Sequence, residues 1–225
     1  MRLHVETNYA HDEQGRLIGV NQWDGGAVPR FWLGRTRAGH VWRFRADVGE
    51  ALITALTALC CAEPCADALD ALPRYAREYE QLLAGEAPIV RRWSGPAYVL
   101  PVDSTPQRPA AALTVQDHAR LLGGLEEWQP DLAHRQPIRA ALVDGRAVAI
   151  CASVRIRAAA HAAGVETVPS AQGSGHACAV VASWAQAVHA LNARALYSTS
   201  WDNGASRRVA AKLGAQLIGV DFHLE

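Results

Sequence analysis

Residues 164–177 read GVETVPSAQGSGHA, a stretch that predicts a strand, a break at Pro169, a loop of small residues and the start of a long helix. A helix N-terminus carries unpaired backbone N–H groups and partial positive charge, so a glycine-rich turn that leads into one can bind anions. Gly173 and Gly175 can adopt backbone conformations that other residues avoid, and they let a phosphate approach the main chain closely. The stretch therefore predicts a site for a phosphate-bearing ligand.

The spacing of this loop excludes two common phosphate-binding motifs. No Gly-Lys-Ser/Thr closes it, as a P-loop requires, and it lacks the GxGxxG and the later acidic residue of a dinucleotide site. The residues instead resemble the GNAT acyltransferase superfamily, whose signature is Gln/Arg-x-x-Gly-x-Gly/Ala. Gln172, Gly175 and Ala177 fit that signature in order, and Pro169 lies where the family often has a proline. An ordinary strand–turn–helix corner is the alternative interpretation of so short a motif.

The elements predicted after the signature resemble the same family. Apolar residues at helical spacing over 176–191 predict an amphipathic helix, and a strand is expected over 195–200. A helix then opens at Asp202-Asn203 and ends at the C-cap glycine Gly214, before a last strand over 216–224. GNAT proteins have this order of helix, strand, Asn-x-x-Ala/Ser helix and strand. The resemblance covers the C-terminal half of the chain.

Residues 1–94 predict a small α+β unit that the resemblance does not reach. Its expected strands span 3–7, 17–20, 31–33 and 41–44, and its expected helices span 50–61 and 66–83, the second kinked or divided by Pro73. Aromatic and arginine residues alternate in the second strand pair. Such residues can stack nucleobases, but their period of two favours one core face and one solvated face. The helix pair is a candidate lid over the acyl-acceptor site.

Residues 95–225 are predicted to form the acyltransferase unit. Before the signature it should contain a strand over 98–102, a helix over 115–128 broken at Gly123-Gly124, and a hairpin of strands 138–143 and 146–157. The hairpin turn, Asp144-Gly145, is a strong signal for such a pair. The resemblance implies an α+β (α/β) chain with the GNAT fold, a mixed central sheet with flanking helices, preceded by the small α+β unit.

Composition excludes several classes of partner. The chain has 22 Lys and Arg against 22 Asp and Glu, so no nucleic acid or anionic membrane is expected to bind it. Its five cysteines are odd in number and lie mostly in apolar contexts, which indicates a reducing cytoplasm. Cys60, Cys61 and Cys65 could suggest a metal, but helix packing explains them better and no metal is expected. Neither a signal peptide nor a membrane-spanning stretch is expected.

The resemblance implies acetyl-CoA as co-substrate, since in that family an amine attacks its thioester directly. Keeping an alkyl amine of lysine-like pKa neutral at pH 7 costs about 3 pK units, or roughly 4–5 kcal/mol. Expelling the thiol as thiolate costs only about 2 kcal/mol. A general base is therefore needed more than a general acid.

Glu166 is the best candidate for this base, because it lies on the strand that leads into the signature, beside the family's place for the thioester. A surface or capping glutamate is an equally open alternative. His161 is the weaker candidate, since 158–163 reads as the loop before that strand. The general acid departs from the family: the Tyr expected seven residues after the Asn of the last helix is Ala210 here. Tyr197, Ser198 and Cys178 are on nearby elements, but none holds that position.

For the co-substrate, the resemblance implies that the backbone of Thr167 and Val168 pairs with the pantetheine arm as an added strand would. Asn203 and Ser206 should contact the arm from the other side, although an N-cap is the ordinary role of Asn203. The pyrophosphate should lie on the amides of Gln172, Gly173, Ser174, Gly175, His176 and Ala177. Arg207 and Arg208 could reach the adenosine phosphate, but a solvated helix face explains them better.

Together these features favour a cytoplasmic N-acetyltransferase that moves an acetyl group from acetyl-CoA to an amine of a small molecule or peptide. Absence of the family's Tyr keeps a second class of function open, a non-catalytic module that binds acyl-CoA. A structural or interaction domain with a coincidental signature is the third. The acceptor, the acyl length and the oligomeric state, a homodimer included, stay open.

Overall fold

The computed structural model describes residues 1–65 and 68–225, whose contacts divide into two units. One unit comprises 1–98, 198–204 and 217–225, and the other comprises 99–197 and 205–216. The contacts thus divide close to the boundary expected after residue 94, but two C-terminal segments belong with the N-terminal unit. The assignment of 1–94 and 95–225 as separate domains stays a prediction.

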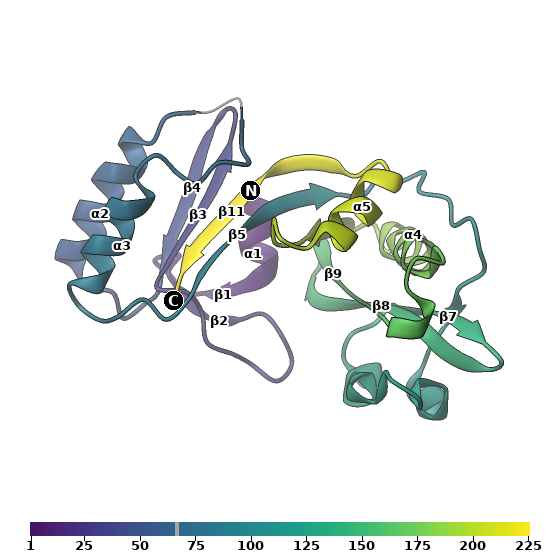
Figure 1. Ribbon diagram of the computed structural model, residues 1–225. Coiled ribbons are helices and arrows are strands. Elements are labelled where there is room, and N and C mark those ends of the chain that lie inside the picture. The colour runs from purple at the N-terminus through teal and green to yellow at the C-terminus, as the bar shows by residue number, and fades with distance from the viewer. Residues whose placement is uncertain (66–67) are drawn as a thin grey trace. The chain divides into compact units, whose positions relative to one another are not determined.

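The first unit is built on a sheet with the strand order β4-β3-β11-β5 (Figure 1). The bounds are Phe31–Thr36 for β3, Gly39–Phe44 for β4, Arg92–Val99 for β5 and Gln216–Leu224 for β11. Both β4 and β11 pair antiparallel with β3. Helices α2, Glu50–Ala62, and α3, Ala76–Ala84, pack on this sheet through a core that includes Phe31, Leu56, Tyr79 and Phe222.

The N-terminal strand expected over 3–7 is wrong, because these residues form helix α1, Arg2–Asn8. The backbone N–H of Val5 donates to the carbonyl of Met1 at 3.1 Å, one helical turn back, so it is not available for a strand ladder. Only a short hairpin of β1, Tyr9–His11, and β2, Leu17–Val20, follows. Since Val5 of α1 and Trp32 of β3 share a core cluster, β3 is buried on both faces and has no solvated face.

Two other helical predictions differ from the structure. The helix expected over 66–83 begins only at Ala76, after Pro73; residues 68–75 are not helical, and 66–67 lie outside the described residues. The helix expected over 115–128 consists of short 3-10 helices: η1, Val115–Leu121, and η2, Glu126–Trp128, with η3, Pro130–Ala133, after them. Gly123 and Gly124, with φ of 106° and 128°, interrupt them.

The second unit carries strands in the order β10-β9-β8-β7-β6 (Figure 1). The bounds are Ala111–Ala112 for β6, Ile138–Val143 for β7, Arg146–Arg157 for β8, Ala160–Thr167 for β9 and Arg194–Ser198 for β10. The predicted β7–β8 hairpin is confirmed, with left-handed Asp144 and Gly145 in its turn. The strand expected over 98–102 ends instead at Val99, before Pro101, whose missing N–H cannot extend a ladder.

Helix α4, His176–His189, packs on β7, β8 and β9, with Trp184 and Val188 fully buried. The short helices lie on the other face of the same strands, where Leu121, Leu125 and Trp128 join a core with Ile150 (Figure 1). β9 runs antiparallel to β8 but parallel to β10, so the sheet is mixed. The predicted fold class, a mixed sheet with flanking helices, is confirmed.

A buried carboxylate in the first unit links α1 to β11. Asp221 accepts from His223 at 2.9 Å and from His4 at 3.2 Å, and the Trp93 ring stacks on His223 with the centroids 5.0 Å apart. Burial alone would raise the pKa of Asp221. The charge of His223, with hydrogen bonds from His223 and His4, outweighs burial and holds this pKa well below its usual value.

Acid should therefore destabilise the first unit through Asp221. A carboxyl whose pKa is lower in the folded than in the unfolded protein stabilises the fold at pH values above its unfolded pKa of about 3.9. This stabilisation is lost as the pH falls toward the folded pKa. We expect chemical denaturation to show stability falling below about pH 5, with a shallower slope in Asp221→Asn. Asp24→Asn, which removes a carboxyl outside the cluster, is the control. Equal slopes in Asp221→Asn and the wild type would contradict this assignment.

Candidate active site

The site begins where β9 and β10 separate. The two strands pair over only three residue pairs, from Arg194↔Ala160 to Leu196↔Ala162. β9 continues to Thr167, and beyond Ala162 it pairs with β8 alone among the described strands. One edge of β9 is therefore left for a ligand that can hydrogen-bond as a strand does.

The backbone hydrogen bonds show which residues of β9 present this edge. The N–H of Arg194 donates to the carbonyl of Ala159 at 2.9 Å, and the N–H of Val168 donates to Val148 on the opposite side at 3.0 Å. In a strand, the N–H and C=O of one residue point to the same side, and successive residues alternate between the two sides. Ala159 therefore shares its side with Val165 and Thr167, which turn their backbone groups to the open edge.

Thr167 turns its backbone to this edge, where its carbonyl also accepts from the side-chain amide of Gln172 at 3.4 Å, but Val168 does not. Its N–H is bonded to Val148, and its carbonyl accepts from Ala171 at 2.9 Å. Both backbone groups of Val168 are engaged within the chain, which leaves neither for a pantetheine arm. Sequence reasoning missed Val165, although the period of two along the strand could have indicated it, because Val165 lies two residues before Thr167.

Glu166 lies on the face of β9 that carries the short helices. Its carboxylate accepts a hydrogen bond from the indole of Trp128 in η2 at 2.5 Å. Gly164, two residues earlier on the same face, provides room for that indole, since a Cβ there would lie 3.1 Å from Trp128 and would overlap Val154. The indole therefore fixes the orientation of a half-buried carboxylate at the end of the strand.

A second carboxylate lies beside Glu166. The negative charge of Glu166 raises the pKa of Glu127, and a hydrogen bond between the two carboxyl groups acts in the same direction. Glu127 is exposed in η2, one residue before Trp128. Two acidic groups thus meet at the face of β9 that is opposite α4.

The loop after β9 has the geometry of an anion site. Gly173 and Gly175 have φ of 77° and 83°, and an added Cβ at either would meet nothing within 4 Å. Gly175 is the N-cap of α4 and supplies no capping side chain, so the first N–H groups of the helix remain for a ligand. The residues expected at the pyrophosphate lie here together: Gln172, Gly173, Ser174 and Gly175 are exposed, and His176 and Ala177 are half-buried.

Asn203 and Ser206 take the positions expected around the start of a helix. Asn203 directly precedes α5, Gly204–Lys212, and is exposed. Ser206 lies in the first turn, with its hydroxyl 2.6 Å from the phenol oxygen of Tyr197 on β10. Ala210, at the position of the family's Tyr, is 1% exposed.

Two solved structures match the chain over most of its length. A GCN5-related N-acetyltransferase-like protein from Streptococcus suis is 16% identical over 88% of this chain and 85% of its own, with a TM-score of 0.50. A GCN5-related N-acetyltransferase from Sphaerobacter thermophilus is 13% identical over 90% and 78%, also at 0.50. The chain has the GNAT fold.

A third GNAT protein, from Novosphingobium aromaticivorans, is 18% identical over 60% of this chain, with a TM-score of 0.47. The chain spans 65% of that protein, less than two thirds of its length. No protein-family model matches the sequence, and no curated protein does. The GNAT fold is therefore shown by structure, at identities too low to carry function with it.

Within this GNAT fold, His161 is not the loop residue that the sequence suggested. It lies in β9, because the β8–β9 turn falls at 158–159. Its Nδ1 is 2.9 Å from the hydroxyl of Ser153, which accepts from the buried Trp184 indole at 3.0 Å, and burial lowers the pKa of His161. It lies five positions before Glu166 on the same strand, so the two side chains point to opposite faces.

Within residues 1–65 and 68–225, no three or more His, Cys, Asp or Glu side chains are placed to bind a metal ion. None of the helices in the described part combines the length and hydropathy that crossing a bilayer requires. Cys60 packs in the core of the first unit, where burial raises the pKa of its thiol to about 12. Arg207 and Arg208 are exposed on α5.

The loop can be tested with a pair of matched glycine variants. Gly175→Val should abolish CoA binding, because a branched side chain would occupy the phosphate's approach and resist the left-handed backbone. Gly145→Val is the control, because Gly145 also has a left-handed φ, of 79°, and an added Cβ there would meet nothing within 4 Å. Gly145 lies in the β7–β8 turn, away from the loop. Calorimetric titration with CoA should show binding by the control only. Wild-type affinity in a folded Gly175→Val protein would mean that the loop holds no phosphate.

Proposed function

We propose that this protein transfers an acetyl group from acetyl-CoA to an amine of a small molecule or peptide. The observation that carries the proposal is the end of β9, where an open backbone edge, an anion loop and an oriented carboxylate follow one another within residues 165–177. Each part suits one portion of the reaction, and the GNAT fold supports their combination.

Acetyl-CoA fits the residues that are present. The left-handed, unobstructed glycines at 173 and 175 leave space that a side chain would fill, next to the N–H groups at the start of α4. The amide-rich pantetheine arm can pair with Val165 and Thr167, which turn their backbone groups to the open edge of β9. The thioester then lies near Glu166 on the same strand.

In the reaction, Glu166 accepts a proton from the attacking amine. The amine nitrogen forms a bond to the thioester carbon, the carbon–sulfur bond breaks, and sulfur leaves with its electron pair. Deprotonating an alkyl amine at pH 7 is the largest single barrier, about 3 pK units, so the carboxylate contributes most of the chemical assistance. Holding both substrates at the end of β9 supplies the rest.

Ligand-induced stabilisation tests the donor. Acetyl-CoA should raise the melting temperature, because a ligand that binds only the folded state stabilises it by about 2.7 kcal/mol at a hundredfold excess over its dissociation constant. ATP and NAD should not, since the loop has neither nucleotide motif, and Gly175→Val should show no shift with any of them. An equal shift with ATP would contradict a CoA site.

A module that binds acyl-CoA without turnover is the second candidate, favoured by the apolar Ala210 on α5. It predicts the same melting shift but no product. Incubation of the wild-type protein with acetyl-CoA and a broad panel of amines, with free thiol measured over time, separates the two. Thiol release that depends on an amine supports the enzyme, and its absence supports the module.

A further inference from the structure

Three buried polar side chains connect α4 to the sheet of the second unit. The indole of Trp184 on α4 donates to the hydroxyl of Ser153 on β8 at 3.0 Å, and that hydroxyl lies 2.9 Å from Nδ1 of His161 on β9. Trp184, Ser153 and His161 are 0%, 1% and 6% exposed. These three residues, the Ser153 network, tie one helix to two strands, in addition to the packing of α4 on the same strands.

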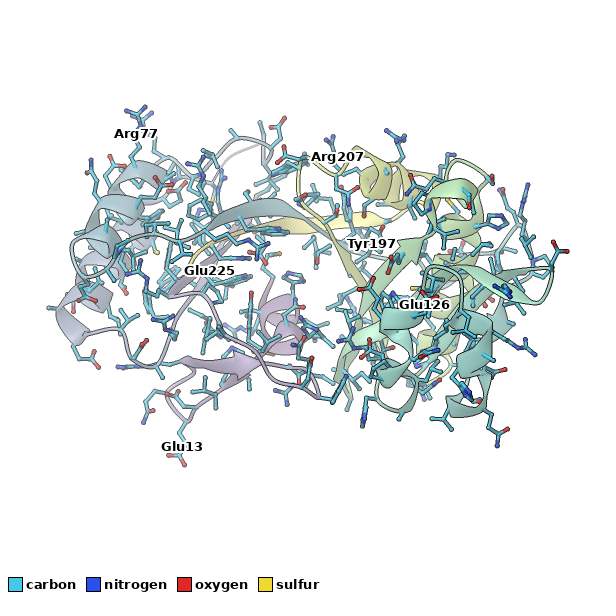
Figure 2. The ribbon with its side chains drawn as sticks, turned by 60° about the horizontal axis from the view of Figure 1, so that its bottom comes forward. Glu13, Arg77, Glu126, Tyr197, Arg207 and Glu225 are labelled. Atoms are coloured by element: carbon cyan, nitrogen blue, oxygen red, sulfur yellow. The ribbon has the colours of Figure 1, made fainter. Side chains whose placement is uncertain are left out.

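The Ser153 network lies near the point where β9 and β10 separate. His161 pairs with Ala195, next to the last residue pair of the two strands. Tyr197, which Figure 2 labels, lies two residues further along β10 on the same face. The open edge of β9 begins directly after this point, and the anion loop joins the end of β9 to α4. The network therefore connects the two elements that the proposed function assigns to the donor.

The hydroxyl of Ser153 has one hydrogen to donate, and this determines the state of the histidine. An indole nitrogen can only donate, so the Ser153 oxygen accepts from Trp184. Among residues 1–65 and 68–225, the other partner of the hydroxyl is Nδ1 of His161. A neutral imidazole with its hydrogen on Nε2 accepts there. In this arrangement the indole hydrogen and the hydroxyl hydrogen both have acceptors.

A proton on Nδ1 of His161 disrupts the arrangement. Nδ1 would become a donor, so the Ser153 oxygen would face two donors, and its own hydrogen would have no acceptor in the part of the chain that the structure describes. A buried hydroxyl without an acceptor is unfavourable, so one of the three side chains must move. Burial already lowers the pKa of His161, which favours the neutral form in the same way.

We propose that Ser153 is a positioning residue whose hydroxyl keeps His161 neutral and ties β9 to α4, so that CoA binding weakens when His161 takes up a proton. This inference rests on the proposed function. There, the pantetheine arm lies on β9 and the phosphates lie at the start of α4, so one donor molecule contacts both elements at once. A movement within the Ser153 network changes the position of one element relative to the other and weakens one of the two contacts.

The direction of the pH effect follows from the lowered pKa of His161. The neutral form belongs to the intact network, so CoA affinity is highest above the ordinary histidine pKa of about 6.5. It falls as the pH drops toward the lower pKa of His161 in the folded chain. Two other groups also titrate in this range, the terminal phosphate of CoA, with a second pKa of about 6, and His176 in the anion loop. The experiment must separate His161 from both.

His161→Asn makes this separation. Its amide oxygen can accept from the Ser153 hydroxyl in place of Nδ1, but the amide cannot take up a proton. Between about pH 8 and about pH 5, the wild type should lose about tenfold more CoA affinity than His161→Asn. His189→Asn is the matched control, because it removes a histidine from the last turn of α4, outside the network, and should keep the wild-type pH dependence. Calorimetric titration with CoA measures all three proteins.

The other charged or titratable groups near the network stay in place in His161→Asn, so they cannot cause a difference from the wild type. On this face of β7, β8 and β10, on α4 and on α5 they are Arg139, Cys151, Tyr197, His176, Cys178, His189, Arg207, Arg208 and Lys212.

Ser153→Ala and Ser153→Thr test the hydroxyl itself. Ser153→Ala leaves the Trp184 indole and Nδ1 of His161 without their partner, so it should weaken CoA binding by about five- to tenfold even at about pH 8. Ser153→Thr keeps a hydroxyl and should recover most of this loss. A side chain that only fills space would not give this recovery, because threonine differs from serine more in volume than alanine does in hydrogen bonding.

The outcomes separate this inference from the function on which it rests. A larger acid loss in the wild type than in His161→Asn supports it. Equal losses in the two proteins, or wild-type affinity in a folded Ser153→Ala, overturn it and leave the acetyltransferase intact. A wild type that binds no CoA at any pH overturns both. If His161→Asn fails to fold, the serine variants decide: no recovery in Ser153→Thr relative to Ser153→Ala overturns the role of the hydroxyl.

Discussion

Glu166→Gln is expected to lower turnover of an alkyl amine by roughly 10²–10⁴, the usual contribution of general acid–base catalysis. The amide keeps the shape of the carboxylate but cannot accept the amine's proton. Acetyl-CoA affinity should be unchanged, because the donor is held by the backbone of β9 and by the loop. Stopped assays of amide formation and the melting shift measure the two quantities separately.

Glu127→Gln is the matched control, since it removes the same charge from the adjacent carboxyl. It should keep most of the turnover, because the Glu166 carboxylate that would accept the amine's proton is still present. The wild-type rate should rise with an ionisation that Glu166→Gln lacks, and the loss should shrink for a weakly basic aromatic amine, which needs little help to deprotonate. Normal turnover of an alkyl amine by Glu166→Gln would remove this residue from the mechanism.

Glu63→Gln should destabilise the first unit by about 3–5 kcal/mol, the cost of breaking a buried ion pair by removing one charge. Glu63 is 5% exposed, and its Oε1 lies 3.8 Å from the Nε of Arg35, which is 2% exposed. The same carboxylate accepts from the N–H of Arg74 and from the phenol of Tyr79. It therefore joins the end of α2 to the start of α3 and neutralises a guanidinium that cannot lose its proton.

The control is Glu80→Gln, which breaks the exposed pair with Arg92 at 3.0 Å and should cost 0–1 kcal/mol, about what surface pairs contribute. The double variant Glu63→Gln with Arg35→Met should lose less than the sum of the two single variants, because the unpaired charge is gone. Denaturant titrations measure all four. A loss from Glu63→Gln no larger than that from Glu80→Gln would contradict the assignment.

The sequence predicted the C-terminal half best, where local signals act alone. The β7–β8 hairpin has its bounds set by the two-residue turn at Asp144-Gly145, and Gly214, with φ of 64°, ends the last helix as expected. The signature loop is equally local. No partner elsewhere in the chain is needed to position any of them.

Errors arose where distant packing overrides a local pattern. Residues 3–7 alternate in hydropathy as a strand would, but they form α1, and Val5 of this helix packs in a core cluster with Trp32 of β3. Val168 matched the family's arm-binding position, yet its N–H donates to the carbonyl of Val148 on β8, a hydrogen bond that no local motif predicts. Trp128 donates to Glu166, and the Tyr197 phenol lies within hydrogen-bonding distance of Ser206; the sequence alone could not assign either pair.

The alternation along β9 also limits how this segment can vary in length. Glu166 and Thr167 are neighbours with opposite tasks, one presenting a side chain to the short helices and the other a backbone edge toward β10. Inserting one residue before them would reverse their roles, placing the carboxylate on the α4 side and the wrong amide at the open edge. Inserting two would restore the facing but shift both by about 7 Å along the strand relative to β8 and the short helices. The segment can thus change its side chains far more freely than its residue count, and insertions should be tolerated in the β7–β8 turn but not between the β8–β9 turn and Gly175.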